Sequence, residues 1–265
     1  MNILILGTGT VEQKLINLCL KSHLLDKIYT ASLEPLEGIP NIEYFSLEEL
    51  IKKVKILQAD ITLVADKELI KSGITDEFRR NNCNIIAVNK KWFNLESSRL
   101  IAKQLISHYS MNIPEIIKAP MSFPIVIKTE DPFSTQIAIS LQDLIEKRKN
   151  LDNKKIFLEE YLNGEILYLS SLWDGENLWN ILPTKNLTEV QEERLNLYKT
   201  KLTFMLSDEK ADFIGFFTSK LIWAKNDWYV LDYIMHIDSN FCFENINKDF
   251  LYILNSAIYQ KLKEI

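Results

Sequence analysis

Residues 156–185, IFLEEYLNGEILYLSSLWDGENLWNILPTK, decide the fold that this sequence predicts. The first part of the stretch holds an apolar run, two carboxylates, an aromatic residue, a leucine, a turn and a third carboxylate: residues 156–158, Glu159, Glu160, Tyr161, Leu162, Asn163, Gly164 and Glu165. A strand that ends in a tight turn can offer a purine an acceptor for its exocyclic amine, an apolar slot for its ring and a carboxylate for its ribose hydroxyls. The segment therefore predicts a nucleotide-binding junction between two strands.

A simpler interpretation fits the same residues. A β-hairpin can carry acidic residues on the face that meets water, and two glutamates before an aromatic residue are common. The two interpretations differ in where they place Glu159 and Glu160, toward a ligand or toward solvent. The segment alone favours neither.

The composition predicts a folded globular protein with one or two domains. Apolar residues make up 47% of the 265 positions, enough to fill a sizeable core. The 31 basic and 36 acidic residues give a net charge of −5 that is spread along the chain. Because this charge does not attract nucleic acid or an anionic membrane, we expect neither as a partner.

Cysteine usage and the first residues bear on location. Cys19, Cys83 and Cys242 lack the spacing of metal ligands and suit a reducing compartment. The opening MNILILG becomes polar after a few residues, which predicts neither a signal peptide nor a spanning helix. We therefore expect a cytoplasmic protein, and the oligomeric state is left without a prediction.

Strand and helix patterns alternate over the first ninety residues or so. Buried strands are predicted at residues 3–6, 27–31, 42–45, 61–65 and 84–88, with helices at residues 11–20, 47–57 and 74–81. This alternation is typical of a parallel, doubly wound sheet. We place a first α/β domain at residues 1–96.

The pattern changes after a predicted helix at residues 95–109 and the IPE of residues 113–115. Strands are expected at residues 125–128, 156–160, 166–173, 177–182, 213–223 and 228–232, with hairpin turns at residues 174–175 and 226–227. A helical run is expected at residues 250–265. We therefore predict a second, α+β unit at residues 97–265, with lobes at about 114–160 and 161–265.

Glycine is scarce, and the GTG of residues 7–9 follows the first strand. Such a turn can bring a pyrophosphate close to a helix N-terminus, as in dinucleotide-binding folds. Glu12 stands where that motif has its third glycine, and its carboxylate would repel a phosphate. A tight strand-to-helix turn is therefore the favoured interpretation over an NAD site.

Six blocks along the chain resemble, in order, the phosphoribosylamine–glycine ligase family of ATP-grasp enzymes. They are MNILILGTGTVEQKL, ADITLVADKELIKSGITDEFR, NLESSRLIAKQLISHYSMNIP, FPIVIK, FLEEYLNGEILYLSSLWDGENLWNILPTKN and GFFTSKLIWAKNDWYVLDY. The resemblance covers nearly the whole chain. It implies a Rossmann-like preATP-grasp domain followed by an α+β ATP-grasp module that holds the nucleotide between two lobes.

The resemblance also implies an activity and a set of site residues. In the family, ATP activates the carboxylate of glycine as an acyl phosphate, phosphoribosylamine attacks it, and Mg²⁺ neutralises phosphate charge. The implied cofactors are ATP and Mg²⁺, and catalytic residues stay unassigned. The implied nucleotide ligands are Lys128, Glu159, Glu160, Tyr161, Leu162 and Glu165, with Gly7, Gly9 and Glu12 toward the substrate and Asp232 toward the metal.

Several charge-handling parts of the family pattern differ here. Thr10, Val11 and Gln13 replace a glycine, an arginine and a histidine, so a cation expected beside a substrate phosphate is missing. Residues 129–140, TEDPFSTQIAIS, contain neither the glycines nor the second lysine of the family's phosphate loop. A long glycine-rich loop after residue 184 is also absent from the sequence. These departures predict a reduced or altered nucleotide site.

The metal motif is altered in the same way. Asp232 can still bind magnesium, but Ile234 offers no oxygen where the family has an asparagine. His236 or Asp238 could compensate. Plain structural roles stay open as well, with Lys128 as a strand-end lysine in water and Asp232 as a solvent-facing strand residue. The tryptophans favour core packing or hairpin pairing: Trp173, Trp179, Trp223 and Trp228.

Two functional classes follow. One is an ADP-forming carboxylate–amine ligase with reduced or altered chemistry. The other is a catalytically inactive relative that keeps the scaffold and the adenine slot as a binding or interaction module. A third possibility is a short paralogue that acts on another amino acid.

Overall fold

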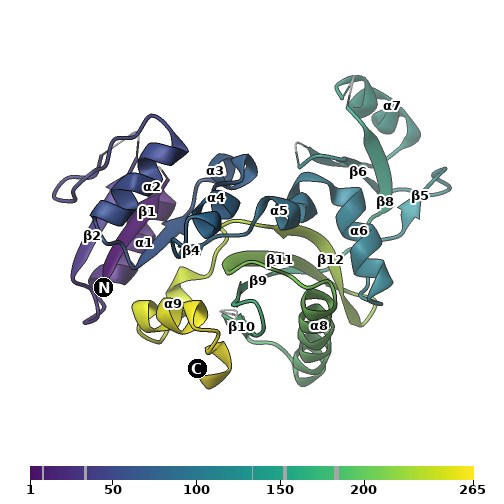
Figure 1. The fold of residues 1–265 in the computed structure, drawn as a ribbon. Coiled ribbons are helices and arrows are strands. Elements are labelled where there is room, and N and C mark those ends of the chain that lie inside the picture. The colour runs from purple at the N-terminus through teal and green to yellow at the C-terminus, as the bar shows by residue number, and fades with distance from the viewer. Residues whose placement is uncertain (8, 33–34, 133, 152–153, 182–184) are drawn as a thin grey trace.

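The computed structural model describes residues 1–7, 9–32, 35–132, 134–151, 154–181 and 185–265. Among these residues the strands form three four-stranded sheets that follow one another from the N-terminal end of the molecule to a small lobe at the far end (Figure 1). The C-terminal helix lies beneath the first two sheets, between them in Figure 1.

The first sheet is parallel, as predicted. Its order is β2-β1-β3-β4, from β1 (Asn2–Leu6), β2 (Lys27–Ala31), β3 (Ile61–Val64) and β4 (Ile85–Ile86). The accompanying helices are α1 (Thr10–Leu20), α2 (Leu47–Ile56), α3 (Lys67–Ser72) and α4 (Ile74–Arg80). Leu4 and Leu6 share a core with α2, whereas Ile3 and Ile5 share another with α1. Both faces of the sheet are therefore covered, which confirms a doubly wound α/β domain.

The strand expected at residues 42–45 is wrong. One parallel bridge joins Thr30 to Asn41, with Ile42 N–H donating to the Thr30 carbonyl at 2.7 Å. The chain then leaves the sheet, and Phe45 is 92% exposed. An alternation of apolar and polar residues resembles a strand even where no neighbour continues the ladder.

The helix expected at residues 95–109 is two helices, α5 (Lys90–Ser97) and α6 (Arg99–His108). Ser98 interrupts them with an extended backbone, φ −134° and ψ 96°. Asn89 caps α5 by accepting the Trp92 N–H, and it donates to Asp212 at 2.8 Å. The break makes Arg99 the first residue of α6.

The second sheet is antiparallel, in the order β10-β9-β11-β12. Its strands are β9 (Glu165–Trp173), β10 (Leu178–Asn180), β11 (Gly215–Ala224) and β12 (Asp227–Ile234), and α8 (Glu189–Asp208) packs against it. The β11–β12 turn is Lys225-Asn226, both with positive φ, so the expected turn is displaced by one residue. The predicted end of the strand at residues 177–182 lies outside the described residues.

The third sheet forms the small lobe, with the order β5-β8-β6-β7 and antiparallel pairing. Its elements are β5 (Ile116–Ile117), β6 (Ile125–Thr129), β7 (Thr135–Ala138), α7 (Leu141–Lys149) and β8 (Ile156–Glu160). Ile125, Ile127, Leu144 and Leu158 form its own apolar core. The α+β prediction for the second half of the chain is confirmed, although β5, β7 and α7 were not predicted.

The C-terminal segment holds the first two sheets together. The predicted run at residues 250–265 divides into α9 (Phe250–Ile258) and a short 3-10 turn (Leu262–Glu264), after another such turn (Phe243–Asn245). Leu251 and Leu254 share one core with Leu15 of α1 and Phe216 of β11. Among the described residues, no helix has both the length and the apolar character needed to cross a bilayer.

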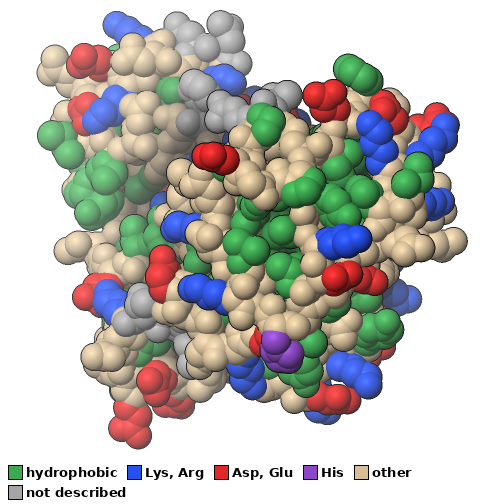
Figure 2. Space-filling model, turned by 90° about the vertical axis from the view of Figure 1, so that its left-hand side faces the viewer, with side chains coloured by type: hydrophobic (Ala, Val, Ile, Leu, Met, Phe, Trp, Pro, Cys, Tyr) green, Lys and Arg blue, Asp and Glu red, His purple; other side chains and the backbone are tan. Residues whose placement is uncertain are grey.

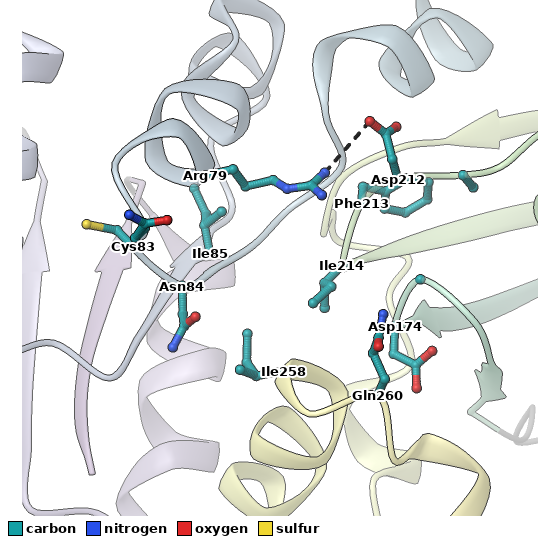
Figure 3. Close-up of a pocket in the computed structure, with 13 residues that line it drawn as sticks. Arg79, Cys83, Asn84, Ile85, Asp174, Asp212, Phe213, Ile214, Ile258 and Gln260 are labelled. Carbon is teal, nitrogen blue, oxygen red and sulfur yellow. Dashed lines mark ion pairs between the residues drawn. The ribbon is translucent and has the colours of Figure 1, made fainter.

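A backbone contact also joins the first two sheets. Ala87 N–H donates to the Ile214 carbonyl at 2.8 Å, and a Cβ on Gly215 would come within 2.7 Å of Ala87. Beside this contact a cavity of about 420 Å³ opens between the two units, where Arg79 and Asp212 face each other at 3.9 Å (Figure 3). On the N-terminal face, side chains of both charges are interspersed among apolar ones (Figure 2).

Candidate functional site

A cavity of about 250 Å³ lies between the second and third sheets. Val126 and Ile137 supply apolar wall from the small lobe, and Ile222 and Leu231 supply it from the second sheet. The turn after β8 closes one side, with Tyr161 and Leu162 in the lining. Five of the six predicted nucleotide residues line this one cavity: Lys128, Glu159, Glu160, Tyr161 and Leu162. Asp232 lines it as well.

Strand β8 determines which way the two glutamates face. Successive side chains of a strand point to opposite faces, so Leu158 enters the lobe core while Glu159 turns toward the cavity. Glu159 is 1% exposed, and the interpretation that it faces water is wrong. Glu160 lies at the rim, where it pairs with Lys225 Nζ at 2.5 Å and accepts the Glu115 N–H at 3.1 Å.

The turn after β8 lies directly against β11. A Cβ on Gly164 would come within 1.9 Å of the Trp223 carbonyl oxygen, so the position requires glycine. Glu165 is outside the cavity lining, and its carboxylate pairs with Lys185 Nζ at 2.7 Å. The sixth predicted nucleotide ligand is therefore directed to a surface ion pair.

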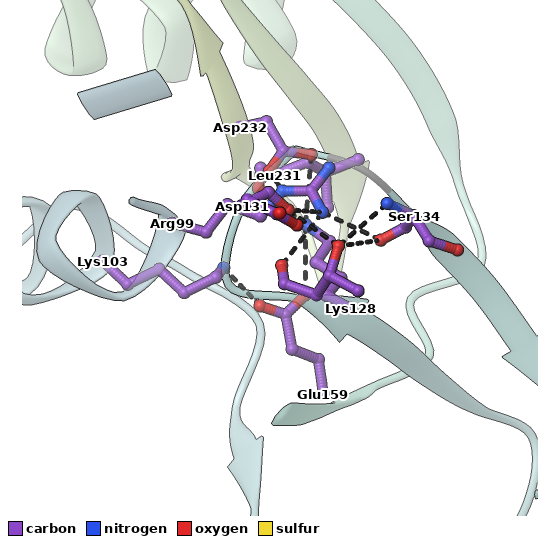
Figure 4. Close-up of polar contacts among 9 residues, drawn as sticks. Arg99, Lys103, Lys128, Asp131, Ser134, Glu159, Leu231 and Asp232 are labelled. Atoms are coloured by element: carbon purple, nitrogen blue, oxygen red, sulfur yellow. Dashed lines mark hydrogen bonds and ion pairs between the residues drawn. The ribbon is translucent and has the colours of Figure 1, made fainter. Parts of the chain in front are cut away.

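Charged side chains form a buried cluster at the inner end of the cavity, drawn in Figure 4. Lys128 Nζ lies 3.4 Å from Glu159 Oε2, and it donates to Asp232 Oδ2 at 3.1 Å and to the Leu231 carbonyl at 2.8 Å. Lys103 Nζ, from α6, lies 2.5 Å from Glu159 Oε1. Lys128 is 2% exposed, so the interpretation of a strand-end lysine in water is wrong.

Arg99 completes the cluster from the start of α6. Its Nε donates to Asp232 Oδ1 at 2.9 Å, so both oxygens of that carboxylate accept from cations. The interpretation of Asp232 as a solvent-facing strand residue is also wrong, because its side chain is 16% exposed. Three cations and two carboxylates make up the cluster, an excess of one positive charge with Lys103 protonated, and the cavity lining adds Glu160 and Lys220.

Burial governs the charge state of Lys103. Removal from water disfavours the ammonium and lowers the pKa of Lys103 below its ordinary 10.5, although Glu159 acts in the opposite direction. Lys128, another cation nearby, lowers this pKa further.

The residues present do not fit a bound Mg²⁺. Asp232 has Arg99 on one oxygen and Lys128 on the other, and Ile234 supplies no ligand. His236 Nδ1 lies 2.9 Å from Glu96, and Asp238 accepts from Asn240, so both compensating candidates have local partners. Among the described residues, no three His, Cys, Asp or Glu side chains gather as a metal site would require.

The glycine turn of the first domain lies elsewhere. Glu12 is 5% exposed, and a Cβ on Gly7 would come within 2.0 Å of its Oε1, so this carboxylate fills the space above the turn. That geometry agrees with a tight strand-to-helix turn. Gly7 and Asp66 line a cavity of about 610 Å³ at the carboxyl ends of β1 and β3. Ligands of open α/β sheets bind at this edge.

Arg99 and Lys103 are the residues that sequence reasoning missed. Both stand in the block NLESSRLIAKQLISHYSMNIP, which was singled out without assigning a role to either. Lys103 shares the buried face of α6 with Ala102 and Ile106, an unusual place for a lysine without a partner. A cation on the apolar face of a predicted helix is the signal that could have identified it. Trp173 and Trp228 are buried in the core, one of the structural roles expected of the tryptophans.

No family model matches the chain. The structure of phosphoribosylamine–glycine ligase from Thermotoga maritima superposes with a TM-score of 0.71 at 17% identity, covering 89% of this chain and 69% of that one. D-alanine–D-alanine ligase from Bacillus anthracis, solved with ATP, gives 0.68 at 15% identity over the full length of both chains.

The chain has an ATP-grasp fold. The Rossmann-like first domain is the preATP-grasp domain, and the second and third sheets are the ATP-grasp module. At the sequence level, phosphoribosylamine–glycine ligase from Fusobacterium nucleatum subsp. nucleatum is 24% identical over 319 residues, covering 100% of this chain and 75% of the relative. The similarity thus extends across both parts of the ATP-grasp architecture.

Proposed function

We propose that this ATP-grasp protein binds an adenine nucleotide in the cavity between β8 and β11, as a relative of ADP-forming carboxylate–amine ligases. One observation carries the proposal: five residues named for nucleotide binding line a single cavity that ends in a net positive cluster. The apolar walls suit the flat face of a purine. The backbone of the turn at Tyr161 and Leu162 suits its polar edge.

The size of the cavity is consistent with the base end of a nucleotide. About 250 Å³ is slightly below the roughly 300–1,000 Å³ of sites that enclose whole drug-sized ligands. In our proposal the adenine enters between Val126 and Ile222, and the phosphates extend toward Lys128. Glu160 is the carboxylate proposed for the ribose hydroxyls, because it lines the cavity and Glu165 does not.

The proposed reaction is ligation of a carboxylate to an amine at the expense of ATP, with glycine and phosphoribosylamine as the substrates to test first. Gly7, Gly9 and Glu12 are assigned to the substrate side of this reaction. The support is the similarity to phosphoribosylamine–glycine ligases and the cavity beside Gly7. We also propose residues 1–96 and 97–265 as the two domains, with lobes at about 114–160 and 161–265.

A second candidate is nucleotide binding without ligation. The state of Asp232 favours it, because both of its oxygens accept from internal cations and phosphoryl transfer needs a counter-charge on the phosphates. In this candidate function the cavity binds the nucleotide and no ligation takes place.

Two measurements on the same protein, ADP release and ADP binding, separate the two candidates. Purified protein is incubated with ATP, MgCl₂, glycine and phosphoribosylamine, and ADP release is followed with Lys128→Ala and Asp232→Ala as controls. A working ligase releases ADP only with both substrates, and both variants abolish it. ADP binding without turnover supports the second candidate. If ADP neither binds nor forms, both candidates are wrong.

A further inference from the structure

The guanidinium of Arg99 lies in a ring of oxygen atoms (Figure 4). Its Nε donates to Asp232 Oδ1 at 2.9 Å, and its Nη1 points to three main-chain carbonyls, those of Thr129 at 3.2 Å, Asp131 at 3.3 Å and Ser134 at 2.9 Å. One carboxylate and three carbonyls are the kind of donor set that a hard cation takes in proteins. Here a protein side chain supplies the cation.

The local backbone holds that cation in place. Because Ser98 breaks the helix, Arg99 begins α6 with its own N–H donating to the Glu130 carbonyl at 2.9 Å. The side chain of Arg99 is 11% exposed, so the contacts are formed largely out of water. The carbonyls of Thr129, Asp131 and Ser134 therefore all turn toward the Arg99 side chain.

The charges of the cluster determine whether the site favours a metal ion or an anion. Asp232 is shared by Arg99 and Lys128, and Glu159 is shared by Lys103 and Lys128. A divalent cation would have to displace one of these partners and would stand beside the remaining cations. A phosphate oxygen meets the opposite field, since the cluster has an excess of one positive charge.

We infer that Arg99 takes the place of a metal ion in this site, so that the protein holds an adenine nucleotide without a divalent cation. The inference rests on the proposed nucleotide binding and extends it. Arg99 is a positioning residue here, because it orients Asp232 and the Asp131 and Ser134 carbonyls and lies behind the cavity lining.

The first test is calorimetric titration of the full-length protein with ADP, once in excess EDTA and once in millimolar MgCl₂. We expect an equal or smaller Kd in EDTA, because free ADP carries more negative charge than its magnesium complex. A Kd that rises about tenfold or more when magnesium is removed overturns the inference and leaves the proposed nucleotide binding intact. Absence of binding in both buffers overturns the proposed function and this inference with it.

The second test removes the internal cation. Arg99→Ala in EDTA is expected to weaken ADP binding about tenfold, because the variant removes one positive charge beside the phosphates and leaves Asp232 with Lys128 as its cation. Millimolar guanidinium in the same buffer, or Mg²⁺ in place of EDTA, should restore part of the affinity by entering the vacated ring of oxygens. An Arg99→Ala protein that binds ADP as tightly as the wild type contradicts the inference.

Matched controls make this test specific. Arg148→Ala removes an exposed arginine from α7 of the same lobe, and its Kd should equal that of the wild type. If Arg99→Ala does not fold by circular dichroism, Arg99→Gln replaces it, since the amide keeps polar contacts without the charge. The same weakening is expected of Arg99→Gln, and a Kd equal to that of the wild type rejects the inference.

Discussion

Lys103 Nζ and Glu159 Oε1 lie 2.5 Å apart, and their side chains are 3% and 1% exposed. One residue comes from α6 and the other from β8, so the pair joins the helix to the small-lobe sheet. Glu159 also faces Lys128 at 3.4 Å. The Glu159 carboxylate therefore contributes to the stability of the fold and also faces any ligand that enters the cavity.

Replacement of Glu159 by Gln should be strongly destabilising. Removal of one partner from a buried ion pair typically costs about 3–5 kcal/mol, because the remaining charges stay buried without compensation. The neighbouring Glu160→Gln variant is the control: its pair with Lys225 is partly exposed, and such pairs contribute at most about 1 kcal/mol. Urea unfolding measures both. Equal losses in the two variants would contradict the assigned burial of Glu159.

Stability should depend on the protonation of Lys103. Burial lowers the pKa of Lys103 in the folded protein below 10.5, so the unfolded chain binds more protons between the lowered value and 10.5. The free energy of unfolding then rises with pH through this alkaline window. Lys103→Met lacks the titrating group.

The comparison is the urea midpoint of wild type and Lys103→Met at several values from neutral pH to about 10, near the lysine reference value. We expect the wild type to gain stability relative to the variant as the pH increases. A difference that stays constant with pH would show that folding leaves the pKa of Lys103 unchanged.

The sequence predicted the scaffold better than the charges inside it. Strand β8 was placed correctly at residues 156–160, and the parallel first sheet followed from alternating strands and helices. Both depend on local periodicity, which can be recognised directly in a sequence. The partners of Asp232 depend on the approach of α6 to β6 and β12, a tertiary contact that no local pattern records.

The predicted boundaries of helices were wrong where a single residue determines them. Ser98 splits a continuous apolar periodicity into α5 and α6, and the sequence signal for that break is one serine. The consequence for the site is large, because the break orients Arg99. Ile234 and Asp232 were recognised as an altered metal motif, yet the pairing of Asp232 with Arg99 required coordinates.

Lys128→Met should weaken nucleotide binding. Lys128 lines the cavity and donates to Asp232, so its loss removes the cation nearest to incoming phosphates. We expect ADP affinity to fall about tenfold or more, since a charge-assisted contact contributes roughly 1.5–3 kcal/mol. The exposed Lys118→Met variant of the same lobe is the control. Thermal shift with ADP reports both, and an unchanged shift in Lys128→Met would remove this residue from the site.

Gly164→Ala should displace the turn that closes the cavity. The added methyl group would come within 1.9 Å of the Trp223 carbonyl, so the turn must move away from β11. A loss of about 1–3 kcal/mol is expected, as for other overpacked positions. Asn163→Ala, one residue earlier and exposed, should lose less than about 0.5 kcal/mol. Comparable unfolding midpoints for the two variants would contradict the close approach.

Binding of an adenine nucleotide in the cavity between β8 and β11 can be observed on the unmodified protein. Hydrogen exchange of the wild-type protein with and without saturating ADP tests it most directly, because it detects binding and locates it. We predict slower exchange at residues 159–164 and 220–232, with little change at the glycine turn of the first domain. Unchanged exchange in both segments at millimolar ADP would contradict the account.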